Sequence, residues 1–140
     1  MINLVEFDYN SMLKEAIQKV PKRAEKNSRF KIPQVNSEIE GQKTIVKNFS
    51  DITQQLRRDP NHVAKYLFKE FAARGNVQNN VLIIQSKVSR ESLQKKLEAY
   101  IKEFIYCKTC GEPDTKLEKE DRITFMKCEA CGAKHAARSV

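Results

Sequence analysis

The sequence predicts an α+β protein with a detached N-terminal amphipathic helix, a small α/β core domain of helices and a mainly antiparallel sheet, and a C-terminal four-cysteine zinc ribbon. Three observations support this fold class. An apolar stripe of helical period precedes a basic stretch near the N-terminus, short strand and helix patterns alternate in the middle, and all 4 cysteines fall in two CxxC pairs near the end. We therefore divide the 140 residues into a helix (1–20), a basic linker (21–29), a core domain (30–104) and a ribbon (105–140).

The composition is basic, with 26 Lys and Arg against 18 Asp and Glu and a formal net charge of +8. This balance suits a partner rich in phosphate better than an acidic small substrate, and the plainer alternative is a solvated surface. No apolar run reaches the roughly 18 residues that span a bilayer, and the N-terminus lacks the basic-then-apolar order of a signal peptide. We expect a cytoplasmic protein that contacts no membrane.

The first predicted helix runs from about Asp8 to Lys19, and Pro21 stops it. A helix of about 12 residues is marginal in water, so it needs a surface to lie against, either its own core domain or another protein. The basic linker that follows separates it from the rest of the chain, which favours an external partner. The apolar residues recur at steps of three and four and form one stripe: Tyr9, Met12, Leu13, Ala16, Ile17 and Val20.

The first half of the core domain contains two extended candidates, Phe30–Ile32 and Lys43–Lys47, separated by the turn-like Glu40–Gln42. Alternation in the second candidate places Thr44 and Val46 on one face of the strand. A short helix is predicted next, over Phe49–Leu56, from the spacing of its apolar residues.

The second half of the core domain is predicted to hold two helices and a central strand. Asp59 caps the first helix, Pro60 occupies its first position, and Gly75 ends it. Val81–Ile84 is a compact apolar run after two turn-forming asparagines and is the best candidate for a central strand. Ser89 caps a long helix that leads directly into the first CxxC pair and turns these residues inward: Leu93, Leu97, Ile101, Phe104 and Ile105.

The two CxxC pairs place two thiolates on each of two tight turns, which together offer the four soft ligands that a tetrahedral Zn²⁺ prefers. Four ligands leave no open coordination position, so we expect one structural Zn²⁺ bound by Cys107, Cys110, Cys128 and Cys131. Gly111 and Gly132 directly follow the second cysteine of each pair and permit positive φ angles there. The strands of the ribbon are predicted at Thr115–Lys119, Arg122–Lys127 and Lys134–Arg138.

Catalytic motifs are not recognisable in the sequence, which has no glycine-rich phosphate loop, no nucleophile elbow and no metal triad with an open position. His62 falls in the first turn of a predicted helix, where a structural or solvent-facing role is expected. His135 lies four residues after the last cysteine and is interpreted as a surface group or a weak RNA contact. We expect a protein that is not an enzyme and takes no small-molecule substrate.

The order of these parts resembles the beta subunit of archaeal translation initiation factor 2, over nearly the whole chain. The middle domain and ribbon are also similar to the N-terminal part of eukaryotic initiation factor five, which is much longer and lacks the leading helix. Ser86 departs from the family, which usually has glycine there. The strings that carry the resemblance are Thr44–Phe49, Leu56–Arg58, His62–Leu67, Glu70, Gly75, Leu82–Gln85, Tyr106–Cys107, Asp114–Thr115 and Cys128–Ala133.

The resemblance implies a subunit of the heterotrimer that delivers methionylated initiator tRNA to the small ribosomal subunit, with GTP held by the gamma subunit. The N-terminal helix would bind the gamma subunit through Tyr9, Met12, Leu13 and Ile17, and the alpha subunit would be reached through gamma. Candidate contacts to RNA phosphates are Arg57, Arg58, Lys65, Lys108, Lys127, Lys134 and Arg138. Two alternatives remain: a transcription-associated zinc ribbon that binds DNA or RNA polymerase, and a free-standing RNA-binding module.

Overall fold

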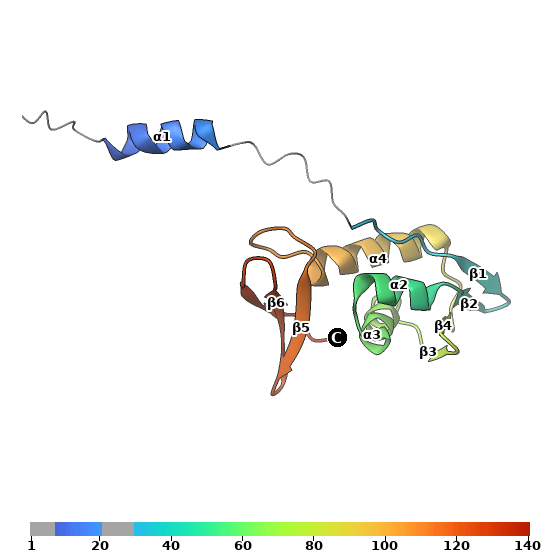
Figure 1. The fold of residues 1–140 in the computed structure, drawn as a ribbon. Coiled ribbons are helices and arrows are strands. Elements are labelled where there is room, and N and C mark those ends of the chain that lie inside the picture. Colours follow the sequence, from blue (N-terminus) through green and yellow to red (C-terminus); the bar gives the residue numbers. More distant parts are fainter. Residues whose placement is uncertain (1–7, 21–29) are drawn as a thin grey trace, which may run out of the picture. The chain divides into compact units, whose positions relative to one another are not determined.

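The computed structural model describes residues 8–20 and 30–140 (Figure 1). The chain divides into two compact units, and the boundary along the sequence falls between Lys31 and Ile32. The described part contains four α-helices and two antiparallel sheets, so the expected α+β class is confirmed. The predicted linker, 21–29, lies outside the described residues. The four-part division of the chain remains a prediction.

The first unit contains the helix α1, Tyr9–Lys19, within one residue of the predicted bounds. Asp8 is the N-cap, and its side chain accepts hydrogen bonds from the backbone N–H and the hydroxyl of Ser11. The backbone turns extended at Val20, directly before Pro21. No residue of α1 is buried, so its apolar stripe is exposed in this structure.

The second unit begins with a four-stranded sheet in the order β1, β2, β4, β3, with all neighbours antiparallel. The strands are β1 Ser37–Glu40, β2 Lys43–Val46, β3 Gly75–Gln78 and β4 Val81–Ile84. The central position of β4 is confirmed. Two tight turns close the hairpins of this sheet. In the turn between β1 and β2, Gly41 has φ +60°. In the turn between β3 and β4, Asn79 and Asn80 have φ 50° and 66°, as a two-residue turn of the type I′ class requires.

One predicted strand of this sheet is wrong, and two of its strands were not predicted. Phe30–Ile32 is not a strand, because the partner of β2 is instead β1, whose residues Ser-Glu-Ile-Glu are mostly exposed and carry little apolar signal. The strand β3 was not predicted at all. Its polar sequence, Gly-Asn-Val-Gln, pairs with β4 only because the asparagine turn folds it back.

Three helices pack on one face of this sheet: α2 Phe49–Leu56, α3 Pro60–Glu70 and α4 Arg90–Phe104. In Figure 1 they lie between the sheet and the ribbon. The core between sheet and helices is formed by residues that are nearly inaccessible to solvent, led by Val46, Phe49, Val63, Leu82, Ile84, Leu93, Leu97, Tyr100, Ile101 and Phe104. The predicted caps Asp59 and Ser89 and the predicted inward face of α4 are confirmed, and Tyr100 joins that face.

Thr44 is fully buried and ties the segment after β4 to the sheet. Its hydroxyl donates to the carbonyl of Ser86 at 2.7 Å and accepts from the N–H of Val88 at 3.0 Å. Ser86 is not among the described residues with positive φ, so serine is accommodated at this position without backbone strain.

Gly75 does not end α3 as predicted, because that helix already ends at Glu70 and Ala72 takes the positive φ of 46°. A glycine is needed at 75 for packing: an added Cβ would lie 2.1 Å from the carbonyl oxygen of Ile83 and 2.5 Å from the ring of Phe68.

We predict that Gly75→Ala lowers the free energy of unfolding by roughly 1–3 kcal/mol through overpacking. Urea unfolding checks this, and a free energy of unfolding equal to that of the wild type would contradict the prediction.

The ribbon is a three-stranded antiparallel sheet of β5 Thr115–Glu120, β6 Ile123–Cys128 and β7 Lys134–Ala137. These bounds agree with the predicted strands to within one residue. Asp121 has φ 53° in the turn between β5 and β6. The positive φ angles predicted for Gly111 and Gly132 are confirmed at 72° and 74°.

Candidate metal centre and binding surfaces

The four cysteines come together at the end of the ribbon where two tight turns face each other. The N–H of Gly111 donates to the carbonyl of Cys107 in one turn, and the N–H of Gly132 donates to that of Cys128 in the other. All four Sγ atoms lie within 4.8 Å of one another, with Cys107 to Cys131 at 3.7 Å and Cys110 to Cys128 at 3.5 Å. A tetrahedron with metal–sulfur bonds of about 2.3 Å has edges of about 3.8 Å, so this spacing fits a four-thiolate metal site.

The backbone around the cysteines favours thiolates. The N–H of Thr109 lies 3.4 Å from Sγ of Cys107, and the N–H of Cys131 lies 3.5 Å from Sγ of Cys128. Backbone N–H groups of Cys110 and Thr109 lower the pKa of Cys107 to about 6. Although the N–H of Glu112 acts in the same direction on Cys110, desolvation and the neighbouring sulfurs raise the pKa of that thiol to about 12. Without a cation, four crowded sulfurs cannot all ionise, so the site requires a metal to hold four thiolates.

Arg58 does not fit the prediction that it contacts RNA phosphate. Its side chain is 9% exposed and its guanidinium points inward at the junction of core and ribbon. Nη1 donates to the carbonyl of Thr115 at 2.7 Å, and Nη2 donates to the Thr115 hydroxyl at 2.7 Å and to the carbonyl of Phe104 at 2.9 Å. Two adjacent arginines look alike in sequence, and only the packing of the ribbon distinguishes them.

Two further predicted phosphate contacts are already engaged within the protein. Arg138 pairs with Glu70 at 3.0 Å and with Glu103 at 3.5 Å, which fastens the end of the ribbon to α3 and α4. Lys134 pairs with Glu120 and lies 4.5 Å above the centre of the Phe125 ring. Both side chains remain partly exposed, but an RNA phosphate would compete with these partners.

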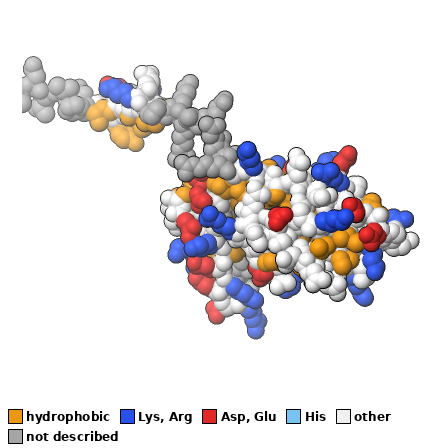
Figure 2. All heavy atoms as spheres, turned by 45° about the vertical axis from the view of Figure 1, so that its right-hand side comes forward, with side chains coloured by type: hydrophobic (Ala, Val, Ile, Leu, Met, Phe, Trp, Pro, Cys, Tyr) orange, Lys and Arg blue, Asp and Glu red, His pale blue; other side chains and the backbone are white. Residues whose placement is uncertain are grey.

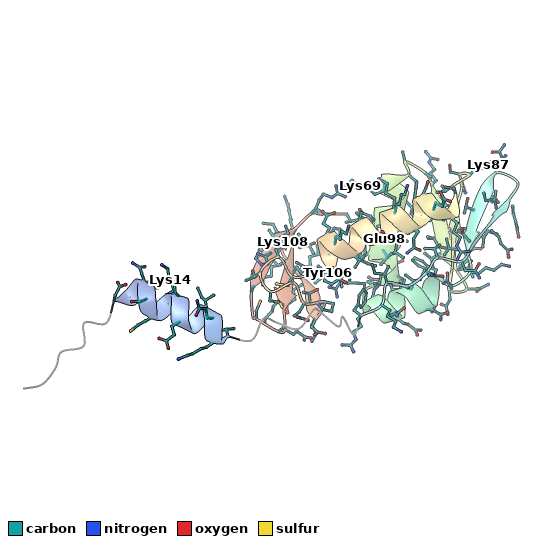
Figure 3. All side chains as sticks on the ribbon, turned by 90° about the horizontal axis from the view of Figure 1, so that it is seen from above. Lys14, Lys69, Lys87, Glu98, Tyr106 and Lys108 are labelled. Atoms are coloured by element: carbon teal, nitrogen blue, oxygen red, sulfur yellow. The ribbon has the colours of Figure 1, made fainter. Side chains whose placement is uncertain are left out.

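The remaining predicted phosphate contacts are exposed on both parts of the second unit. Arg57 follows α2, Lys65 lies on α3, Lys108 lies in the first cysteine turn and Lys127 lies on β6. Among the ion pairs found in residues 8–20 and 30–140, none includes these four side chains. Figure 3 shows Lys108 at the ribbon end of this unit and Lys87 at the opposite end.

The four residues predicted to bind a partner lie on the exposed stripe of α1. Tyr9 is 70% exposed, Met12 47%, Leu13 43% and Ile17 65%. Figure 2 shows the apolar side chains of α1 gathered along one side of the helix, with charged side chains on the other. No residue of α1 is buried, so this stripe is available for a partner.

His62 has a structural role in the aromatic core rather than a catalytic one. Its Nδ1 lies 2.9 Å from the hydroxyl of Tyr100, and its ring packs edge-on against Phe104 at 5.2 Å. Burial, followed by the charge of Arg58, lowers the pKa of His62 from 6.5. His135 differs: its Nε2 lies 3.0 Å from the hydroxyl of Thr109 in the first cysteine turn.

The lowered pKa of His62 predicts a pH dependence of stability. The unfolded chain, with an ordinary histidine pKa of 6.5, takes up the proton before the folded protein does. The stability that neutral His62 provides is therefore complete above pH 6.5 and is lost as the pH falls below 6.5 through the lowered pKa. Urea unfolding of the wild type and of His62→Gln at pH values above and below 6.5 checks this. Both proteins contain the same cysteines, so the difference between their free energies of unfolding reports on His62. A constant difference between the two proteins would contradict the prediction.

Sequence reasoning missed three residues near the second cysteine turn. Thr115 is buried and accepts from Arg58, and Lys116 pairs with Glu129, which directly follows Cys128. The sequence placed Thr115 and Lys116 at the start of a predicted strand, and Thr115 and Glu129 fall in strings that carry the family resemblance. No pattern indicated that this strand end faces Arg58.

No helix within residues 8–20 and 30–140 combines the length and the apolar character needed to cross a membrane.

Comparisons with known proteins give a consistent result. A family model described as a domain found in initiation factors two-B and five matches residues 21–134. A protein named translation initiation factor 2 subunit beta from Methanococcus maripaludis strain C7 is 45% identical over 127 residues, which is 91% of this chain and 92% of the relative. Proteins of the same name from Methanosphaera stadtmanae and Methanopyrus kandleri are 39% and 38% identical, over 95% and 96% of this chain and 94% and 98% of the relatives.

Proposed function

The chain belongs to the family of beta subunits of archaeal translation initiation factor 2, and from this premise we propose that it acts in the heterotrimer that delivers methionylated initiator tRNA to the small ribosomal subunit in a GTP-dependent manner. In this proposal the chain works in the cytoplasm and is not itself an enzyme. It contributes binding surfaces, and the gamma subunit binds and hydrolyses GTP.

The observation that carries the proposal is the exposed apolar stripe of α1. A stripe of Tyr9, Met12, Leu13 and Ile17 follows the i, i+3, i+4 spacing with which an amphipathic helix occupies a groove on a partner. Membership of the family supports the gamma subunit as that partner, and in this proposal the alpha subunit is reached through gamma. Such a helix adds affinity without requiring the rest of the chain to touch gamma.

The four-cysteine site holds one Zn²⁺ in this proposal. Four thiolates at these separations suit a tetrahedral, borderline-soft ion and leave no position for water or substrate. The ion therefore folds the ribbon and has no chemical step of its own.

The exposed basic residues Arg57, Lys65, Lys108 and Lys127 contact RNA phosphates in this proposal, with initiator tRNA or ribosomal RNA as the source. The positive net charge and their freedom from ion pairs within the described residues support this role. Lys134 and Arg138 are weaker candidates because each is held by two partners, Lys134 by Glu120 and the Phe125 ring and Arg138 by Glu70 and Glu103.

Affinity purification from the native host tests the proposal. We expect a tagged full-length chain to retain a GTPase subunit, initiator tRNA and small ribosomal subunits. The same chain carrying Leu13→Ala and Ile17→Ala is the matched control, and it should lose the GTPase while keeping its metal. Recovery of RNA polymerase in place of the GTPase would instead support a transcription-associated zinc ribbon and would overturn the proposal.

A further inference from the structure

Arg58 occupies an unfavourable environment for an arginine. Its guanidinium is buried, its Nε has no hydrogen-bond partner, and none of the ion pairs found in the described residues includes it. Burial of a cation without a carboxylate costs free energy, and arginines are seldom buried unpaired. Stability alone is therefore a poor explanation for an arginine at this position.

Three acceptors of Arg58 lie where the ribbon joins the core. They are the carbonyl of Phe104 at the end of α4 and both oxygens of Thr115 at the start of β5. The Thr115 hydroxyl in turn donates to the carbonyl of Ile105 at 2.7 Å. One planar side chain thus binds the last turn of the core and the first strand of the ribbon at the same time.

These bonds bring together basic residues from two parts of the chain. Arg57 precedes Arg58, and Nη1 of Arg58 also donates to the Arg57 carbonyl at 3.2 Å. Lys116 follows Thr115 and is directly opposite Lys127 in the register of β5 and β6. The bond from Arg58 to Thr115 therefore connects the segment of the core that carries Arg57 to the strand of the ribbon that carries Lys116, with Lys127 on the neighbouring strand.

Acidic side chains lie among these cations at Glu129 and Glu118. Glu129 forms an ion pair with Lys116, and its backbone N–H donates to the carbonyl of Asp114, directly before Thr115. Glu118 shares a face of β5 with Lys116. The side chains of Arg57, Lys116, Glu118, Lys127 and Glu129 are all exposed. The surface is therefore accessible, combines three cations with two carboxylates, and spans the boundary between core and ribbon.

We propose that Arg58 is a positioning residue that seats the ribbon on the core, so that Arg57, Lys116 and Lys127 form one composite surface for the phosphate backbone of single-stranded RNA. This inference rests on the proposed RNA contacts and deepens them: it adds Lys116, removes Arg58 from direct contact, and makes the contribution of Arg57 depend on Arg58. The ion pairs of Arg138 hold the other end of the ribbon on α3 and α4, so variants at Arg58 keep the ribbon attached.

The test measures the affinity of the full-length, metal-loaded protein for fluorescently labelled oligouridylate as a function of salt. Each phosphate contact with a single strand contributes about 0.7 to the slope of log affinity against log salt. Replacing Arg57, Lys116 and Lys127 by Gln should lower the slope by about 2. When the salt concentration rises from about 50 to about 200 mM, the triple variant should therefore lose roughly 20-fold less affinity than the wild type loses. Glu129→Gln should strengthen binding, and Lys87→Gln, at the far end of the unit, should change little.

The role of Arg58 is tested by measuring whether the effect of Arg57→Gln on the salt slope depends on the residue at position 58. Arg57→Gln should lower the slope by about 0.7 in the wild type and by nothing further in Arg58→Lys. Thr115→Val removes the hydroxyl from the same junction and should behave like Arg58→Lys. Metal content and amide spectra of each variant establish that it is folded. A variant that is only less stable would still lose about 0.7 of the slope when Arg57 is replaced by Gln.

Each outcome has a distinct meaning. If the wild type shows no salt-dependent binding, the proposed RNA contacts fail and this inference fails with them. If binding is normal but the triple variant keeps the full slope, the composite surface is wrong while RNA binding elsewhere stands. If Arg57→Gln still lowers the slope in Arg58→Lys and in Thr115→Val, the positioning role of Arg58 is refuted.

Discussion

Replacement of Cys128 by serine is expected to abolish stoichiometric metal binding and to unfold the ribbon. Cys128 is 1% exposed, its Sγ lies 3.5 Å from that of Cys110, and it accepts the N–H of Cys131. A serine hydroxyl remains protonated at neutral pH and is a poor ligand for a soft-ligand site. Three remaining thiolates would leave the ion weakly bound.

The loss of fold follows from the small size of the ribbon. Within residues 107–137 only four side chains are buried, those of Cys107, Thr115, Met126 and Cys128. Two of the four are cysteines of the proposed metal site, so the remaining apolar core is far below what a small domain needs. Structural Zn²⁺ contributes about 10–16 kcal/mol of apparent binding free energy in modules of this kind, and the variant loses most of it.

The core domain should stay folded but melt at a lower temperature in this variant. Once the ribbon unfolds, the guanidinium of Arg58 loses both oxygens of Thr115 and must find water instead. Elemental analysis measures the metal content, and amide spectra recorded as the temperature rises show whether the ribbon is folded and where the core domain melts. Ala130→Ser, between the two cysteines of the same turn, is the matched control because it adds a hydroxyl and removes no thiolate. One metal ion per chain and protected ribbon amides in Cys128→Ser would contradict the prediction.

The parts of the fold that sequence could predict are those that depend on local chemistry. The spacing of the cysteines indicated the metal site, the Asp59–Pro60 pair indicated the start of α3, and the apolar run of β4 indicated a central strand. In each case a cap, a ligand or an apolar run requires the same local structure whatever it packs against. The α1 helix belongs to the same class, since its cap, its stripe and its proline stop are all local.

The parts that failed depend on contacts between distant residues. The strands β1 and β3 are edge strands, and they carry few apolar residues because only one neighbour pairs with them. Gly75 looked like a helix end, whereas the reason for glycine there is the carbonyl of Ile83 on the neighbouring strand. Arg58 looked like a second exposed cation beside Arg57, whereas its partner Thr115 lies 57 residues further along the chain. No local pattern carries such information.

Alanine at both Leu13 and Ile17 is expected to weaken binding to the purified gamma subunit by roughly 100-fold to 1,000-fold. Each apolar anchor that moves from water into a groove contributes about 1.5–2 kcal/mol, so removing two costs about 3–4 kcal/mol. Alanine is the best helix former, so the variant keeps α1 helical and the loss reports on contacts alone. Deletion of residues 1–20 should abolish binding altogether, while the metal content stays at one ion per chain.

The opposite face of the same helix provides the control. Lys14 and Gln18 lie on the far side of α1 from the stripe at about 100° per residue, and alanine at both should leave the affinity within a few-fold of the wild type. Calorimetric titration of gamma with each protein measures the affinities. Undiminished affinity in the protein that lacks residues 1–20 would show that gamma binds elsewhere.

Alanine at both Leu13 and Ile17 also distinguishes binding of an external partner from packing of α1 against the protein's own core domain. If Leu13 and Ile17 covered the core domain in solution, their loss would leave apolar surface exposed there and lower the melting temperature of the second unit. If they serve only gamma, the melting temperature of the isolated chain stays unchanged while the affinity for gamma falls. We expect the second result, because α1 belongs to a separate compact unit in which none of its own residues is buried. A lower melting temperature without a change in affinity would reverse the assignment of this helix.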